Sequence, residues 1–261
     1  MPSAESSETQ IRAFYAALTQ ACGPQHWWPA QGRFEVIVGA FLTQNTSWIN
    51  VERAISNLRH ARALSIAALR RLPLAELEKL IYPAGYFRQK ARRLKTFVAF
   101  LDTRYGGSLE RMFAQPTAAL REELLALNGI GPETADSILL YAGNHPVFVV
   151  DAYTRRIVQR HRFLPPNAGY EQIRELFERA LRKTPPAENP GSAAQQPSLA
   201  RLAHHPSRMS KAERSLVAQV FNDMHALLVV VGKNYCFKKA PKCEGCPLQP
   251  FLPCRSGTAQ P

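Results

Sequence analysis

Apolar residues recur at helical spacing along most of this 261-residue chain. Within residues 9–21, for example, Ile11, Phe14 and Leu18 fall on one stripe, as in an amphipathic helix. The segment 147–150 is also apolar, but it is short and isolated, and we expect a buried connection there rather than a strand. The pattern therefore predicts an all-α protein. The expected helices cover residues 9–21, 34–43, 50–60, 65–71, 74–82, 87–105, 117–127, 132–142, 152–161, 170–182 and 211–231.

Three local features refine this picture. Residues 34–43 are apolar on nearly every face, which is typical of a helix buried in the core. Thr117 follows Pro116 and is the expected N-cap of the helix over 117–127. By contrast, residues 184–210 are rich in Pro, Ser, Ala and Gln, so we expect a flexible insertion and not a catalytic element.

The chain is strongly basic, with 33 Lys and Arg against 20 Asp and Glu and a formal net charge of +13. Such a balance indicates a polyanionic partner, either nucleic acid or, less directly, an anionic membrane surface. Hydrophobic residues make up 46% of the chain, which excludes a mostly disordered protein. No apolar run approaches the roughly 18 residues of a transmembrane helix, and the N-terminus lacks the pattern of a secretory signal. We therefore expect a cytoplasmic protein that does not enter membranes.

Four of the five cysteines lie close together near the C-terminus. They are Cys236, Cys243, Cys246 and Cys254. A tight cluster in a chain without a secretory signal indicates a metal site rather than disulfides. Cys22 stands alone, and we expect it to be a small buried residue of the core.

The segment Asn128-Gly129-Ile130-Gly131 separates two amphipathic helices. Glycines in so tight a turn permit positive φ angles and leave backbone N–H groups uncovered. Pro132 then suits the first position of the second helix, and the helix N-terminus together with the exposed N–H groups forms a site for a DNA phosphate. Such a contact holds the duplex without reading its sequence. The alternative is an ordinary turn between two helices, capped by glycine.

The hairpin sequence LNGIGPETA, followed by Asp151 in VFVVDAYTRRIVQRH, resembles the helix–hairpin–helix DNA glycosylases of the endonuclease III superfamily. The resemblance covers residues 10–183 and 215–254. It implies a two-lobed all-α fold with a C-terminal iron–sulfur cluster loop and with the active site in the cleft between the lobes. The implied parts are an N-terminal segment 1–30 that packs with the C-terminal lobe, a helical lobe 31–145 that contains the hairpin (117–142), and a C-terminal lobe 146–254 that contains the insertion 184–210 and the cysteine cluster 236–254.

The same resemblance implies that Asp151 is the essential carboxylate. Breaking an N-glycosidic bond develops positive charge on the sugar, and a nearby carboxylate stabilises that charge or activates a water molecule. Asp151 would also serve as the N-cap of the helix over 152–161, and both interpretations can hold together.

Glu133 occupies the position at which bifunctional members of the superfamily carry a lysine that attacks the sugar. A carboxylate cannot form the imine that precedes strand cleavage. We therefore expect a monofunctional enzyme that leaves an abasic site, with Glu133 and Asp151 on opposing sides of the bound nucleotide. The alternative for Glu133 is a first-turn acid that faces the helix dipole.

The segments WWPA, FEVIVGAFLTQNT and YPAGYFRQKARRLK are similar to bacterial 3-methyladenine DNA glycosylases built on this fold. In that branch the flipped base stacks between aromatic side chains, and Trp27 and Trp48 match the two positions. A cationic alkylated purine over a tryptophan face gains about 0.5–2 kcal/mol. Trp28 and Pro29 adjoin the pair, and Lys233 aligns loosely with a pocket lysine. The alternatives are tryptophans of the core and, for Lys233, an ordinary surface position.

The resemblance also implies contacts to DNA. Gln44 matches a polar wedge that fills the gap left by the flipped base, and residues 85–88 match a second intercalating loop. An ordinary glycine-terminated helix is the alternative for that loop. The basic run 90–95 would supply charge near the DNA backbone, unless it is a solvated face. The expected DNA-contacting residues are Gln44, Gly85, Tyr86, Phe87, Arg88, Gly129, Ile130, Gly131 and Thr134.

The spacing of the four clustered cysteines is similar to the C-terminal loop that holds a [4Fe–4S] cluster in this superfamily. The last gap, between Cys246 and Cys254, is longer than is common there, with seven residues. Zinc is the alternative, because it also binds four thiolates. The role of the group would be structural or DNA-positioning, since hydrolysis of an N-glycosidic bond needs no redox step. The three lysines within 237–242 would then meet DNA phosphates.

Together these features predict a DNA glycosylase of base excision repair that acts as a monomer on double-stranded DNA containing a damaged base. The expected substrates are 3-methyladenine and 7-methylguanine. One alternative keeps the enzyme class but changes the base to uracil or thymine opposite guanine, or to an oxidised base. The other alternative is a protein that binds damaged DNA without excising the base.

Overall fold

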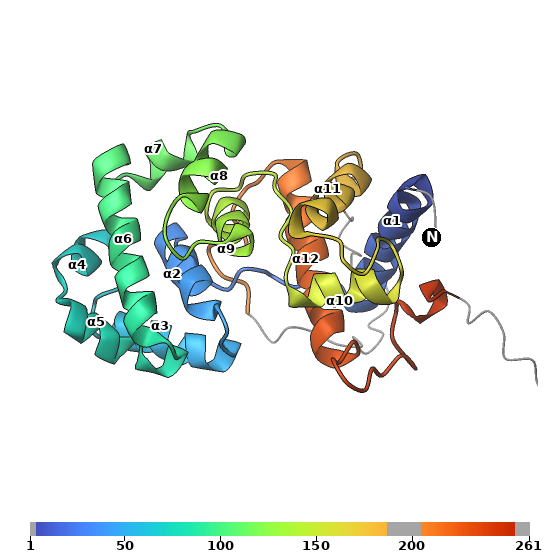
Figure 1. Ribbon diagram of the computed structural model, residues 1–261, viewed down its shortest axis with the longest axis horizontal. Coiled ribbons are helices and arrows are strands. Elements are labelled where there is room, and N and C mark those ends of the chain that lie inside the picture. The colour runs from blue at the N-terminus through green and yellow to red at the C-terminus, as the bar shows by residue number, and fades with distance from the viewer. Residues whose placement is uncertain (1–3, 187–204, 254–261) are drawn as a thin grey trace, which may run out of the picture. The chain divides into compact units, whose positions relative to one another are not determined.

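The computed structural model describes residues 4–186 and 205–253, and these residues form helices and turns without a strand (Figure 1). Most of the expected insertion and the expected ligand Cys254 lie outside the described residues. The chain divides into two compact units. The first unit takes in Met1–Trp27, Val147–His205 and Arg214–Pro261, and the second unit takes in Trp28–Pro146 and Pro206–Glu213.

The first unit is assembled around one long apolar helix, α12. This helix packs against α1, α10 and α11, and most of its residues are buried. In α1, the expected stripe of Ile11, Phe14 and Leu18 is fully buried, which confirms it as a core face. The helices of this unit are α1 (Ala4–Cys22), α10 (Ala152–Arg160), α11 (Tyr170–Leu181), α12 (Leu216–Asn234) and the short η3 (Gln249–Phe251).

By length and composition alone, α12 would be able to cross a membrane, and it is the only such helix among the described residues. The apolar pattern of the sequence predicted no segment of this kind. However, 72% of its most apolar window is buried inside the protein. Packing against three neighbouring helices therefore explains its apolar character, as for other core helices.

The second unit is built around α2. Every residue from Phe34 to Leu42 is buried, which confirms the expected core helix. α2 packs against α3, α6, α9 and η2, and α6 and α9 flank it in Figure 1. The helices are α2 (Arg33–Thr43), α3 (Trp48–His60), α4 (Ile66–Arg71), α5 (Leu74–Leu80), η1 (Tyr82–Ala84), α6 (Phe87–Tyr105), α7 (Leu109–Phe113), α8 (Thr117–Leu125), α9 (Pro132–Ser137) and the π-helical turn η2 (Ile138–Ala142).

The structure corrects some of the expected helix ends. The helix expected over 211–231 begins only at Leu216. The helix expected over 74–82 ends at Leu80 and is followed by η1. The pattern did not predict α7, which is too short to show a helical period. The expected connection 147–150 is confirmed, because all four of its residues are buried and none lies in a helix or strand.

Thr117 is the first residue of α8, and the N-cap is Pro116, so the expected cap is wrong. The hydroxyl group of Thr117 lies 2.9 Å from Nδ1 of the buried His145 instead. The Thr117 hydroxyl group therefore makes a tertiary hydrogen bond instead of the helix-capping hydrogen bond that the local pattern predicted.

Candidate functional site

The expected hairpin forms between α8 and α9 in the second unit. Gly129 has a φ of +86°, which glycine adopts without strain. Gly131 is exposed and has a φ of −94°. The prediction that the glycines adopt positive φ angles is therefore confirmed at Gly129 and wrong at Gly131. The N–H group of the buried Ile130 donates to the carbonyl oxygen of Leu127 (3.1 Å). That group serves the turn itself and is not offered to a phosphate.

Gln44, the expected wedge, is tied to this hairpin by hydrogen bonds. Its Nε2 donates to the carbonyl oxygen of Gly129 (3.1 Å) and to the hydroxyl group of the buried Thr134 (2.8 Å). Its Oε1 accepts from Nη1 of Arg93 (2.7 Å). The structure thus brings together three of the expected DNA-contacting residues. Arg93 was missed as an individual site residue, and its only sequence signal is its place in a basic run.

The second expected loop presents an exposed aromatic side chain. Gly85 and Tyr86 have positive φ angles of +65° and +45°, and Tyr86 is 68% exposed. A positive φ strains a residue with a Cβ, and such strain gathers at functional sites. Phe87 packs beside Tyr82 with ring centroids 5.0 Å apart, and the Arg88 guanidinium lies 5.2 Å from the Phe87 ring. The loop therefore holds Tyr86 out while Phe87 packs against its neighbours.

Two lysines of the basic run after this loop serve the protein itself. Lys90 is buried, and its Nζ donates to the carbonyl oxygens of Leu42 and Ala84, each at 2.8 Å. Burial lowers the pKa of Lys90 to about 8, and the positive charge of Arg93 acts in the same direction. Lys95 donates to carbonyl groups at the end of α4. The ammonium groups of these two lysines are therefore engaged by carbonyl groups of the protein, and the charge that the run supplies to DNA stays a prediction.

Two of the three tryptophans meet in the second unit. Trp28 is buried, and its ring contacts Trp48 edge to face with a centroid distance of 5.2 Å. Trp48 is only half-buried and donates from Nε1 to Oε1 of Glu52 (2.8 Å). The ring of Tyr141 lies 5.1 Å from Trp28, and a Cβ at Gly39 would come within 3.2 Å of the Trp28 ring. Trp28 is thus a core residue that supports Trp48.

The other expected pocket residues differ in their exposure. Trp27 belongs to the first unit and is buried, Pro29 is half-buried, and Lys233 is exposed near the end of α12. Tyr141 is fully buried in η2 and was missed, because a tyrosine in an apolar helix looks like ordinary core in the sequence. In the structure Tyr141 packs beside Trp28, with the two ring centroids 5.1 Å apart.

Asp151 caps α10 in the first unit. Its Oδ1 accepts from the N–H group of Thr154 (2.7 Å), which confirms the N-cap interpretation. Its Oδ2 lies 3.7 Å from Nε2 of His225, a buried residue of α12 that the sequence did not point to. Burial lowers the pKa of His225 more than the charge of Asp151 raises it, so the imidazole is neutral near pH 7. Glu133 belongs to the second unit, where it is exposed in the first turn of α9.

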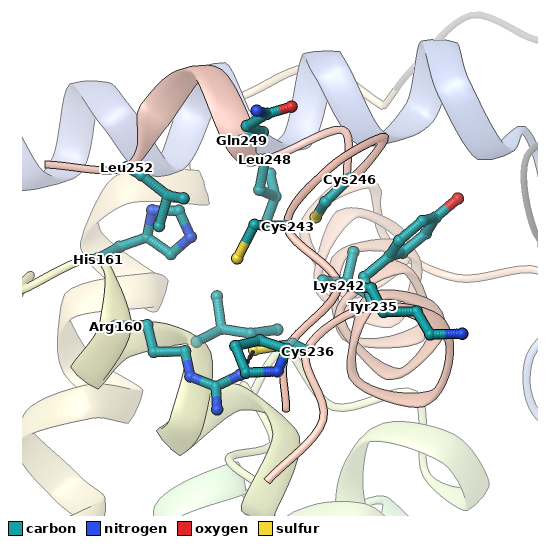
Figure 2. Close-up of a pocket in the computed structure, with 13 residues that line it drawn as sticks. Arg160, His161, Tyr235, Cys236, Lys242, Cys243, Cys246, Leu248, Gln249 and Leu252 are labelled. Carbon is teal, nitrogen blue, oxygen red and sulfur yellow. Dashed lines mark hydrogen bonds between the residues drawn. The ribbon is translucent and has the colours of Figure 1, made fainter. Parts of the chain in front are cut away.

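The cysteine loop follows α12 in the first unit. Cys236, Cys243 and Cys246 line one pocket, and Figure 2 shows their sulfur atoms around a common space. Arg160 reaches this pocket from the end of α10 and donates from Nη1 to Sγ of Cys236 (2.9 Å). Arg156, one helical turn earlier, donates from Nε to the carbonyl oxygen of Cys236 (2.5 Å). Both arginines therefore hold the start of the cysteine loop against α10.

Three of the four expected cysteine ligands line one pocket, and the fourth, Cys254, lies outside the described residues. In the part of the chain that the structure describes, no three or more His, Cys, Asp or Glu side chains are grouped to hold a metal ion. Tetrahedral zinc needs four thiolates at about 2.3 Å from one point, whereas each thiolate of a cubane cluster binds a different iron. Both groups take four thiolates, and the three thiols that the structure describes line one pocket.

The residues around these cysteines also bear on the expected roles. Cys22 is buried, as expected, and burial together with the nearby Cys246 raises its pKa to about 11. Cys22 therefore remains a thiol of the core. Lys238, Lys239 and Lys242 are exposed, and their contact with DNA phosphates stays a prediction.

The chain is similar to DNA repair proteins along nearly its whole length. Residues 38–183 match the family described as HhH-GPD superfamily base excision DNA repair protein. Over 248 residues the chain is 39% identical to "Putative DNA repair glycosylase MJ1434" of Methanocaldococcus jannaschii, which covers 95% of this chain and 97% of that protein.

Two solved structures extend the similarity to three dimensions. The H. pylori 3-methyladenine DNA glycosylase bound to 1,N6-ethenoadenine has a TM-score of 0.67 at 25% identity, covering 87% of this chain and 97% of that one. A trapped covalent intermediate of endonuclease III with DNA has a TM-score of 0.69 at 20% identity, covering 94% and 95%. At 20% identity, the similarity to the endonuclease III structure is a similarity of fold.

Proposed function

Because this chain belongs to the HhH-GPD superfamily of base excision DNA repair proteins, we propose that it is a monofunctional DNA glycosylase that releases alkylated purines from double-stranded DNA. The observation that carries the proposal is the pair Trp28 and Trp48, with one ring buried and the other half open. Purines alkylated at N3 or N7 are cationic. Such a base would gain about 0.5–2 kcal/mol over the electron-rich face of Trp48.

The surroundings of Trp48 prepare it for this role. Its edge-to-face contact with Trp28 and its hydrogen bond to Glu52 restrict the ring to one orientation. A flipped base then meets a platform that is already ordered, so less entropy is lost on binding. The carboxylate of Glu52 also adds negative potential beside the ring, which favours a cation over a neutral pyrimidine. The modified purine held by the H. pylori relative agrees with this choice of substrate class.

Asp151 supplies the chemistry in this proposal. The N–H group of Thr154 holds Oδ1 in place, and we assign to Oδ2 the stabilisation of the positive charge that develops on the sugar. His225 lies 3.7 Å from Oδ2, and because burial lowers its pKa it places no opposing positive charge there near pH 7. A water molecule activated by the carboxylate would then complete hydrolysis, with a free base and an abasic sugar as the products.

The strand is expected to stay intact after base release. Glu133 stands where a nucleophilic lysine would be required, and a carboxylate forms no imine. Lys90, on the helix that contacts the hairpin region, does not offer a substitute, because its amine is buried and bonded to two carbonyl groups.

We further propose that the four clustered cysteines hold a [4Fe–4S] cluster, with zinc as the alternative. When bound, the cluster would supply a rigid centre for the loop and no step of the hydrolysis. Arg156 and Arg160 fasten the loop to α10 through Cys236. The loop is therefore attached to the same helix that Asp151 caps.

The decisive experiment measures base release from DNA treated with a methylating agent, with the products separated by chromatography and strand nicking followed in parallel. Release of methylpurines without nicking supports the proposal. Folded, metal-loaded protein that releases no methylpurine contradicts it, and release of uracil or thymine from mismatched duplexes would favour the alternative substrate class.

A Trp48→Ala variant tests the observation that carries the proposal. We expect it to release methylpurines about 2- to 30-fold more slowly, which corresponds to the loss of one cation–π contact. Ile49→Ala is the matched control, because Ile49 is the neighbouring residue on α3 and is exposed. Equal rates for the wild type and Trp48→Ala would remove the support that the aromatic pair lends to alkylpurines.

A further inference from the structure

We propose that Arg93 is a positioning residue that locks Gln44 onto the hairpin, so that the wedge loop (residues 43–47) and the hairpin (residues 126–131) meet DNA as one rigid surface. This inference rests on the proposed function, because it assumes that both segments face the duplex. It assigns a role to a side chain of α6 that need not touch the damaged base.

The three partners of Gln44 determine how its amide is oriented. An arginine can only donate, so Oε1 must face Arg93. A carbonyl oxygen can only accept, so Nε2 must face Gly129. The hydroxyl group of Thr134 accepts a second hydrogen bond from Nε2. Rotation of the amide by 180° would oppose donor to donor and acceptor to acceptor, so one orientation is strongly favoured.

Arg93 also packs directly on the hairpin backbone. A Cβ built on Gly129 would lie 2.0 Å from Nε and 2.5 Å from Cδ of Arg93. The missing side chain at Gly129 therefore makes the space that Arg93 occupies, in addition to permitting the φ of +86°. The hairpin and Arg93 fit together as a matched pair.

The same helix supports the neighbouring loops. Lys90, one turn before Arg93 on α6, donates to the carbonyl oxygens of Leu42 and Ala84. The first of these lies just before the wedge loop and the second just before the exposed aromatic loop. Thr46 of the wedge loop donates to the carbonyl oxygen of Ala84 as well (2.5 Å). α6 is thus a common support, and within it Arg93 is the residue that reaches the wedge side chain.

As a consequence, Arg93 couples the position of the Gln44 side chain to the position of the hairpin. With its amide held against the hairpin, Gln44 enters the duplex only in a position set by the phosphate contact of the hairpin. Without Arg93, the side chain would sample several rotamers and lose that freedom on insertion. Insertion would then become weaker even though Gln44 itself is present.

The test uses the full-length protein and a duplex that carries a tetrahydrofuran abasic-site analogue beside a 2-aminopurine base. Insertion of the wedge unstacks 2-aminopurine and raises its fluorescence, so affinity and insertion are read in one titration. The variants are Arg93→Ala, Gln44→Ala and the double variant. Arg92→Ala is the matched control, because Arg92 is the adjacent, exposed arginine of α6 and carries the same charge.

We expect Arg93→Ala to lower the fluorescence change and to weaken binding to the abasic duplex about tenfold or more. Binding to intact duplex should fall only as much as in Arg92→Ala. In the Gln44→Ala background, Arg93→Ala should add no more than the effect of Arg92→Ala, because the side chain that it positions is gone. Equal losses in both backgrounds, or equal losses from the two arginine variants, would overturn the proposal.

A second measurement on the free protein keeps the outcome clear. The side-chain amide protons of Gln44, observed by NMR, should exchange slowly with solvent in the wild type and in Arg92→Ala, and faster in Arg93→Ala. Unchanged exchange in Arg93→Ala would overturn the proposal. A wild-type protein that opens the abasic duplex but releases no methylpurine would contradict the proposed substrates alone, and the role of Arg93 would stand.

Discussion

The hairpin of the second unit and the cysteine loop of the first unit are both irregular segments next to helices, but they are held in different ways. At the hairpin, side chains of the protein complete the structure, because Gln44 bonds to Gly129, to Thr134 and to Arg93. In the cysteine loop, three thiol groups surround one pocket. The first segment is organised by side chains of the protein, and for the second we propose a bound metal group.

Burial explains this difference. Ile130 of the hairpin is buried, and the lysine that supports the wedge loop is fully buried. In the cysteine loop, by contrast, residues 238–242 are all exposed. A loop that buries little apolar surface gains little from packing, so the metal group proposed for it would contribute much of its stability. The comparison leads to four predictions, which follow from the largest expected effect to the smallest.

Removing one cysteine ligand is expected to have the largest effect. Cys243→Ser should lose its metal and lower the free energy of unfolding by several kcal/mol, because binding and folding of such loops are coupled. The measurements are elemental analysis for iron and zinc, visible absorption and denaturant unfolding. Cys22→Ala, which removes a cysteine of the core, should keep the full metal content. Full metal content in Cys243→Ser would contradict Cys243 as a ligand, and loss of the metal without loss of stability would show that the loop does not depend on the group.

Asp151→Asn is expected to slow base release by about a thousandfold, because the charge opposite the developing cation is lost. Its stability should stay within about 0.5 kcal/mol of the wild type, since asparagine caps a helix as well as aspartate does. Single-turnover base release and thermal unfolding separate the two roles of the residue. A variant that releases base at the wild-type rate would leave Asp151 as a helix cap only.

The two hairpin glycines should respond differently to the same change. Gly129→Ala should lower the free energy of unfolding by about 1–3 kcal/mol, because it strains a φ of +86° and collides with Arg93. Gly131→Ala should change stability by less than about 0.5 kcal/mol, since no atom lies within 4 Å of its Cβ. Its effect should appear in duplex affinity instead, where the methyl group would crowd a phosphate. Equal stabilities of the two variants would contradict the packing of Arg93 against Gly129.

The last prediction concerns the pH dependence of stability at Lys90, where the expected effect is small for each pH unit. Its pKa falls from 10.5 to about 8 on folding, so between these values the unfolded state binds more protons than the folded state. The free energy of unfolding should therefore rise with pH in this window, by on the order of 1 kcal/mol per pH unit. Lys90→Met lacks this contribution. Urea unfolding of both proteins at pH 7 to 10 should show the free energy of unfolding rising more steeply with pH in the wild type than in the variant. The same pH dependence in both proteins would contradict a buried amine at Lys90.

Local sequence determined most of the helices and the cap at Asp151. α6 spans Phe87–Tyr105, the range that the pattern predicts, because left-handed residues at Tyr86 and Gly106 end the helix on both sides. Asp151 caps α10 through a residue only three positions away. Apolar periodicity and capping depend on neighbours in the chain, so they can be read without the fold.

Tertiary structure alone decided which side chains work together. Gln44 bonds to Thr134, 90 positions along the chain, and Lys90 bonds to Leu42, 48 positions away. A charged residue in an amphipathic helix predicts exposure, and only the presence of two carbonyl groups from other segments explains why Lys90 is buried. Periodicity and caps determined the helices and the candidate chemistry of this protein, whereas packing between distant segments decided how its site is held.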